Sequence, residues 1–205
     1  MVKKNQIIYL IAAGIALVVM IYSFTGESQE AFNQSIIEHR KEIDYFMKNS
    51  RESPFSKNRE EYKGLTYYEP DISYKVRATF APIQDKKLVN LSTSDGKIER
   101  YRKYGMATFE MHGKENTLII LKPAISGPMG ETLFLGFGDE TSAVETYGGG
   151  RYLNPEHDGG STILLDFNKA YNPYCAYNEE YSCAIPLTDN LLSIPIYAGE
   201  KDFHH

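Results

Sequence analysis

The sequence predicts a mostly β protein, an antiparallel sandwich or barrel with an N-terminal transmembrane helix and one amphipathic helix packed on the sheet. Three observations support this fold class. An uncharged apolar segment lies near the start of the chain, a stretch with helical periodicity follows it, and short alternating segments separated by turn residues fill the remainder. They divide the chain into a membrane anchor over residues 1–26, an amphipathic helix over residues 27–52 and a β-rich domain over residues 53–205.

The first predicted element is the membrane anchor. Residues 7–24 form an uncharged, mainly apolar run of 18 residues, and a spanning helix needs about 20. Lys3 and Lys4 precede this run, so the positive-inside rule places the following domain outside the cytoplasm, periplasmic or extracellular. We therefore expect a single-pass protein of the cell membrane. A cleaved signal peptide is the alternative, although its apolar region would be shorter and would end in an A-x-A-like pattern.

The second predicted element is a helix from Ser28 to about residue 49. Its apolar residues recur at spacings that share one helical face, namely Phe32, Ile36, Ile43 and Met47. Ser28 has the side chain of an N-cap residue. This helix is expected to connect the membrane to the domain and to pack its apolar stripe on the sheet.

The β-rich region begins near Ile72, where the apolar period changes to two. Residues 73–80 alternate between polar and apolar side chains, as in a half-buried strand. Further alternating groups follow at residues 107–111, 133–137, 163–167 and 194–196, with turns at residues 95–96, 112–116 and 126–130. Short strands at this spacing indicate an antiparallel sandwich or barrel.

Composition and motifs leave several function classes without support. The net charge is −5, and the chain from Glu27 onward carries 20 basic and 27 acidic residues, which disfavours nucleic-acid binding. The five histidines show no zinc spacing, so no metal site and no cofactor is expected. The sequence lacks the GxSxG motif of common hydrolases, the HExxH motif of metalloproteases, the P-loop of nucleotide-binding proteins and the dinucleotide-binding fingerprint.

The candidate site lies in the second half of the chain, where polar residues directly follow apolar strands. Asp139, Asp166 and Asn168 occupy such positions, and unpaired polar groups in a core are costly. The glycine triplet 148–150 precedes Arg151; backbone N–H groups and a guanidinium fork can together hold an anion. The alternative is a glycine-rich bend with Arg151 paired to Asp139 or Asp166.

The predicted ligand-binding surface combines these groups with nearby polar side chains. It consists of Asp139, Tyr147, Gly149, Arg151, Asp166, Asn168, Asn172 and Glu200. Asp139, Asp166 and Glu200 could also supply a hydrolytic carboxylate pair, or, with Asn168 and Asn172, ligands for a hard cation. All of these residues could instead cap turns and bond buried backbone groups. Tyr171, Tyr174, Tyr177 and Tyr181 cluster nearby and suit either a ligand surface or the rim of the core.

Cys175 and Cys183 are the two cysteines of the chain. In an oxidising location outside the cytoplasm they predict a disulfide. Closing that short loop would stabilise the fold by about 2.5 kcal/mol.

The same region carries a resemblance to a known family. The stretches that carry it are FGDETS at 137–142, TYGGGRYL at 146–153, LDFNKAYNPYCAY at 165–177, the series Cys183, Pro186 and Asn190-Leu191, and AGEK at 198–201. In these the chain resembles the bacterial and archaeal family catalogued as domain of unknown function 1684, over roughly residues 38–202. The resemblance implies no activity, because none is assigned to that family.

Three functional hypotheses follow from these observations. The leading one is a membrane-anchored binding module for a small polar or anionic ligand or a protein partner, with its site at the surface formed by Asp139, Arg151, Asp166 and Asn168. The second is a hydrolase that uses paired carboxylates, and the third is a structural envelope component. Convergence of Asp139, Arg151, Asp166 and Glu200 on one open pocket would favour the first two, and their burial in mutual ion pairs would favour the third.

Overall fold

The computed structural model describes residues 28–85, 87–125 and 131–203. Within these ranges no helix is both long enough and apolar enough to cross a membrane. The anchor predicted over residues 7–24 lies outside the described residues.

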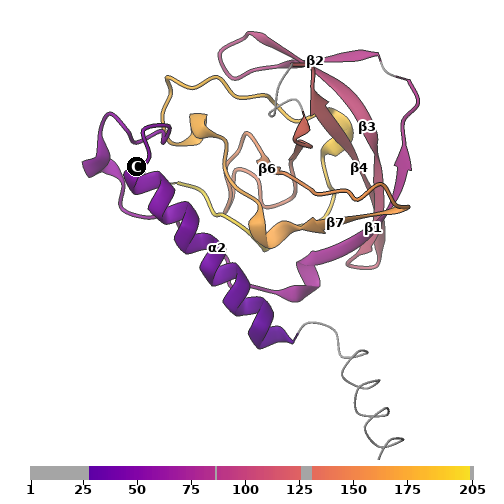
Figure 1. Ribbon diagram of the computed structural model, residues 1–205, viewed down its shortest axis with the longest axis horizontal. Helices are drawn as coiled ribbons and strands as arrows, with labels where there is room; N and C mark the ends of the chain where they lie inside the picture. Colours follow the sequence, from indigo (N-terminus) through magenta and orange to yellow (C-terminus); the bar gives the residue numbers. More distant parts are fainter. Residues whose placement is uncertain (1–27, 86, 126–130, 204–205) are drawn as a thin grey trace, which may run out of the picture.

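The long helix α2 spans Gln29–Asn49 and confirms the predicted amphipathic helix. Ser28 is its N-cap, and the Ser28 hydroxyl oxygen accepts a hydrogen bond from the Ala31 N–H at 3.2 Å. The predicted apolar stripe faces inward: Phe32 and Ile36 are fully buried, and Met47 joins a small apolar cluster near the end of the helix. α2 runs along one side of the molecule, with most of the strands on the far side (Figure 1).

The main sheet has five antiparallel strands. These are β1 (Lys75–Pro82), β2 (Leu88–Ser92), β3 (Ile98–Met111), β4 (Lys114–Pro123) and β7 (Thr162–Asp166). β3 is the longest strand: its first half pairs with β2, its second half with β1, and β4 runs along its other edge. β1 then pairs with β7. The prediction of an antiparallel, mostly β fold is confirmed.

A second, two-stranded sheet consists of β5 (Leu135–Phe137) and β6 (Arg151–Leu153). Isolated bridges join it to the main sheet at both edges. Phe134, next to β5, bridges Leu121 of β4, and Glu156, beyond β6, bridges Leu164 of β7. The strands therefore follow one another around a ring, in a barrel-like arrangement.

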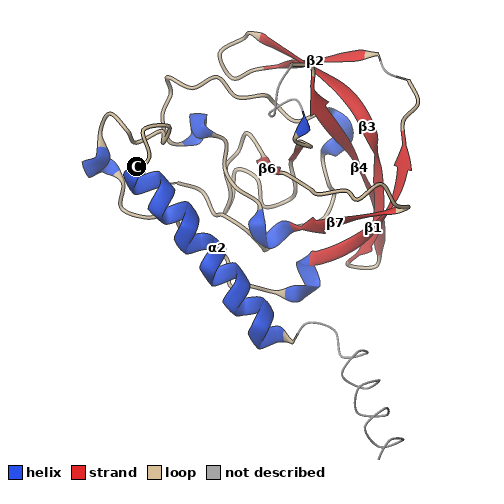
Figure 2. Cartoon of the chain, in the orientation of Figure 1, coloured by secondary structure: helices blue, strands red, loops and turns tan. Residues whose placement is uncertain are grey.

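Short 3-10 helices and loops make up much of the part that lies between the ring and α2 (Figure 2). The helices are η1 (Arg59–Glu61), η2 (Ile72–Tyr74), η4 (Phe167–Lys169), η5 (Tyr174–Ala176) and η6 (Thr188–Asn190). η4 directly follows β7, and its polar residues Asn168 and Lys169 lie across a cleft from α2.

The core is filled by the inward faces of the ring. Its fully buried members include Ala78, Ala107, Leu118, Ile120, Leu135, Phe137, Leu165, Phe167 and Ile196. Close packing also explains Gly105, which lies at the β3 irregularity between Lys103 and Gly105. A Cβ atom built on Gly105 would lie 2.2 Å from the ring of Phe80, so glycine is required for β3 to pass this ring.

Candidate functional site

Arg151 is a buried structural residue. Its side chain is fully buried, and Nη2 donates to the Asp139 Oδ2 at 2.9 Å and to the Ile196 carbonyl at 2.9 Å. Nη1 donates to the carbonyls of Ala198 and Glu200. The guanidinium thus neutralises the Asp139 carboxylate and links residues 196–200 to β6. The structure shows the alternative arrangement, in which Arg151 is paired with Asp139, and it gives no support to the prediction that Arg151 anchors an anionic ligand.

Asp139, the acidic member of this buried ion pair, accepts further hydrogen bonds through its second carboxylate oxygen. Its Oδ1 accepts from the Thr141 N–H at 2.8 Å, from the Thr141 hydroxyl at 2.6 Å and from the Ile196 N–H at 3.1 Å. A carboxylate that carries this many internal donors is satisfied without a ligand.

The remaining predicted polar residues form two further internal networks. Asp166 caps η4 by accepting from the backbone and side-chain N–H groups of Asn168, and Asn168 also bonds both the N–H and the carbonyl of Asp71. Asn172 donates to Glu200 from its backbone and its side chain. Tyr147 and Gly149 lie elsewhere, with the Tyr147 hydroxyl 3.8 Å from the Cys175 sulfur. The eight predicted residues therefore do not line one pocket, and only Asn168 and Glu200 reach the cleft described next.

The principal cleft lies between α2 and the segment that runs from η4 to η5. It has a volume of about 600 Å³, within the range of small-molecule sites. Its lining comes from five parts of the chain: α2, the loop at Tyr67, the end of β6 with the residues that follow it, the stretch from Asn168 to Tyr174, and Glu200. Helix packing on the loops after β7 thus creates a site that no single sequence segment contains.

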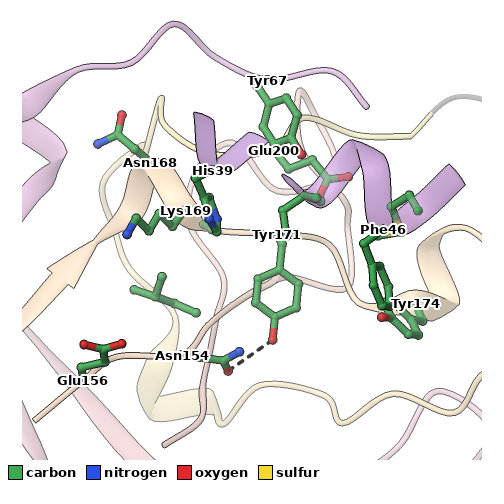
Figure 3. Close-up of a pocket in the computed structure, with 14 residues that line it drawn as sticks. His39, Phe46, Tyr67, Asn154, Glu156, Asn168, Lys169, Tyr171, Tyr174 and Glu200 are labelled. Atoms are coloured by element: carbon green, nitrogen blue, oxygen red, sulfur yellow. Dashed lines mark hydrogen bonds between the residues drawn. The ribbon is translucent and has the colours of Figure 1, made fainter. Parts of the chain in front are cut away.

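One end of the cleft is polar. His39 and Lys169 lie there together, and Asn154 and Glu156 lie below them (Figure 3). Burial, together with the nearby Lys169 ammonium, lowers the pKa of His39 below its usual value, which keeps the ring neutral at pH 7. Lys169 is exposed and makes no ion pair within the described part of the chain. Its ammonium group is therefore available to a ligand.

The other end of the cleft is apolar and aromatic. Phe46 and Tyr174 lie side by side there (Figure 3), and Ile43 and Met47 of α2 belong to the same apolar cluster and also line the cleft. Tyr171 stands between the two ends, and its hydroxyl donates to Asn154 Oδ1 at 3.2 Å. The arrangement suits a small molecule that has an apolar part and a polar group.

Glu200 lies beside Tyr67 at the inner wall of the cleft (Figure 3) and is almost fully buried. Its carboxyl oxygens accept from the Tyr177 hydroxyl, at 2.7 and 2.8 Å, and from Asn172. Burial nevertheless raises the pKa of Glu200 to about 7, because desolvation outweighs these donors and the Arg151 charge. Glu200 is therefore a group whose charge changes near neutral pH.

Cys175 and Cys183 are free thiols in this structure. The Cys175 N–H donates to the Cys183 sulfur at 3.1 Å, so the two residues are in direct contact. The disulfide predicted from the sequence is not formed here, and it stays a prediction about the oxidised protein.

The sequence does not identify several residues that line the cleft, among them His39, Tyr67, Asn154, Glu156 and Lys169. One signal was available, because the tyrosine cluster was noted as a possible ligand surface and two of its members, Tyr171 and Tyr174, line the cleft. Among residues 28–85, 87–125 and 131–203, no group of three or more His, Cys, Asp or Glu side chains is arranged to hold a metal ion.

Comparisons with known proteins agree with the resemblance noted in the sequence. Residues 60–201 match the family described as "Protein of unknown function (DUF1684)". The chain is also similar to the solution NMR structure of the uncharacterized protein from gene locus rrnAC0354 of Haloarcula marismortui. The two are 35% identical, the match covers 86% of this chain and 97% of that one, and the TM-score is 0.66. No curated protein matches this chain.

Proposed function

We propose that this chain, which belongs to the DUF1684 family of proteins of unknown function, is a membrane-tethered binding module for a small amphipathic ligand. The ligand has an apolar part and an anionic group, and it occupies the cleft between α2 and the segment from η4 to η5. The observation that carries the proposal is the cleft itself, in which His39, Lys169, Asn154 and Glu156 lie at one end and the rings of Phe46 and Tyr174 lie at the other.

The charge of the ligand follows from the polar end. Lys169 offers a cation that forms no ion pair with the residues described by the structure, whereas neutral His39 and the Asn154 amide offer hydrogen bonds. An anionic group beside Lys169 would form charge-assisted hydrogen bonds, which are the stronger kind. Glu156 lines the same end and disfavours a ligand with several negative charges. We therefore assign a single anionic group to the ligand.

The apolar part of the ligand would pack on Ile43, Phe46 and Tyr174, which are each partly exposed in the cleft. Covering these side chains removes apolar surface from water, at about 25 cal/mol per Å² buried. The apolar contacts would supply most of the affinity, and the polar end would orient the ligand.

The tether is the apolar run over residues 7–24 together with Lys3 and Lys4. It would hold the module at the cell membrane and outside the cytoplasm. α2 begins at Gln29, shortly after this run, so the cleft lies along the helix that follows the anchor in the sequence.

The structure gives the hydrolase hypothesis less support. Asp139 and Asp166 are occupied by internal hydrogen bonds, and of the three carboxylates considered from the sequence only Glu200 lines the cleft. Glu156 also lines it, but the two glutamates lie far apart in Figure 3 and do not face each other.

An NMR titration tests the proposed function with two probes of equal length and opposite charge, octanoate and octylammonium. Octanoate has about ten non-hydrogen atoms, so a Kd on the order of 1 mM is expected. We expect shifts of the amide signals of Phe46, Lys169 and Tyr171 with octanoate and much weaker ones with octylammonium. Equal shifts with both probes would contradict the anionic assignment, and no shift at the cleft with either would contradict the binding function.

A further inference from the structure

The two thiols differ sharply in exposure. Cys175 lies on η5 and is partly exposed, whereas Cys183 is buried in an apolar cluster with Leu91, Tyr101 and Phe134. Cys175 is therefore the more accessible of the two residues to a dissolved reagent.

Three hydrogen-bond donors surround the Cys175 sulfur. They are the thiol of Cys183 and the hydroxyls of Ser94 and Tyr147, the last at 3.8 Å. Ser94 is held in place because its hydroxyl oxygen accepts from the Cys183 N–H at 3.2 Å and its own N–H donates to the Cys183 carbonyl at 2.9 Å. Donors directed at one sulfur stabilise its thiolate form, which is the nucleophile in sulfur chemistry.

The acidities of the two thiols agree with this geometry. The Cys183 hydrogen bond, with those of Ser94 and Tyr147, lowers the pKa of Cys175 to about 6. The same thiol–thiol hydrogen bond and burial raise the pKa of Cys183. Cys183 thus keeps its proton while Cys175 loses one.

We propose that Cys175 and Cys183 are a redox-active dithiol that reacts with disulfides of small molecules or peptides, with Cys175 as the attacking thiol. The Cys175 thiolate attacks one sulfur of the substrate disulfide, forms a mixed disulfide and releases one thiolate. Cys183 then gives up its proton and attacks the Cys175 sulfur, and the second substrate thiolate leaves. The substrate disulfide gains two electrons and becomes two thiols, and the Cys175–Cys183 pair loses two electrons and becomes a disulfide.

This activity is independent of the proposed cleft ligand. It also differs from the inert structural disulfide that the cysteine spacing predicts, because a structural disulfide resists reduction by glutathione whereas a redox-active pair exchanges with it.

The test uses the reduced full-length chain with oxidised glutathione as the substrate disulfide. Mass spectrometry should show that the Cys183→Ala variant accumulates one glutathione on Cys175. The wild-type chain should instead form the internal disulfide and release two reduced glutathione molecules, and an excess of reduced glutathione should reverse this reaction. The Cys175→Ala variant should stay unmodified. Circular dichroism checks that both variants keep the wild-type fold.

A second measurement tests the role of the surrounding donors. Carbamidomethylation of Cys175 by iodoacetamide should be half-maximal near pH 6 in the reduced wild-type chain. The Tyr147→Phe variant removes one donor and should raise that midpoint, with Tyr45→Phe, an exposed residue on α2, as the matched control. The proposal is overturned by a midpoint near the ordinary value of about 8.5. It is also overturned by the absence of a mixed disulfide in Cys183→Ala, or by a wild-type disulfide that glutathione cannot reduce.

Discussion

Replacing Arg151 by methionine should strongly destabilise the fold. The variant keeps an apolar stem of similar length but removes the partner of Asp139 Oδ2, which is buried along with the whole Arg151 side chain. It also removes the donors that serve the carbonyls of Ile196, Ala198 and Glu200. Breaking a buried ion pair from one side costs about 3–5 kcal/mol, because the remaining charge stays in the interior without compensation.

Thermal unfolding of Arg151→Met, followed by circular dichroism at pH 7, measures this cost. For a domain of this size each kcal/mol shifts Tm by roughly 2–4 °C, so a decrease of roughly 6–20 °C is expected. Arg77→Met, which removes an exposed arginine from β1, is the matched control and should change stability by about 0.5 kcal/mol or less. Adding Asp139→Asn to Arg151→Met should recover part of the loss, since no unpaired charge remains. A decrease in Tm no larger than that of the control would refute the structural role of Arg151.

Three further perturbations follow from the buried groups. The pKa of Glu200 is raised to about 7 in the folded protein, so the folded state binds the Glu200 proton more tightly than the unfolded state does. The protonated carboxyl therefore contributes about 3 kcal/mol to stability below about pH 4.5, and this contribution is lost as the pH rises through 7. Urea denaturation across this pH range should show that decline in wild type and a flatter profile in Glu200→Gln. Asn190→Ala should lower the free energy of unfolding by about 3 kcal/mol, because the fully buried Asn190 side chain accepts a hydrogen bond from the Ile119 N–H and donates to the carbonyls of Ile119 and Gly136. A loss under 1 kcal/mol would contradict this expectation. Phe32→Ala should cost about 3 kcal/mol through the cavity left under α2, and an unchanged urea midpoint would mean that α2 is not packed on the domain.

The elements that depend on local pattern could be predicted from the sequence. α2 was found within a residue of its observed start, because its apolar period and its Ser28 cap are both encoded within a few turns of chain. Alternation likewise located β1, and the predicted turn over residues 112–116 falls where β3 returns as β4. The predicted membrane anchor falls outside the described residues.

The candidate site could not be predicted in the same way, because its residues meet only through long-range packing. The sequence around Arg151 is compatible with an anion-binding site and with an internal ion pair. Which of the two forms depends on the position of the carbonyls of Ile196 and Ala198, which accept hydrogen bonds from Arg151 in the fold. His39 and Lys169 are far apart in sequence and become neighbours only when α2 covers η4. Sequence pattern therefore identified polar residues that need partners but not which of them remain free for a ligand.

The binding function proposed for the cleft is tested most directly by removing the Lys169 cation. Octanoate is titrated into the wild-type chain, Lys169→Met, and Lys87→Met as a matched exposed control, with amide NMR signals as the readout. Loss of the cation at a partly exposed site should weaken octanoate binding roughly five-fold, corresponding to about 1 kcal/mol, while Lys87→Met binds as wild type does. Octanoate binding of unchanged strength in Lys169→Met, or signal shifts located away from α2 and η4, would contradict the proposal.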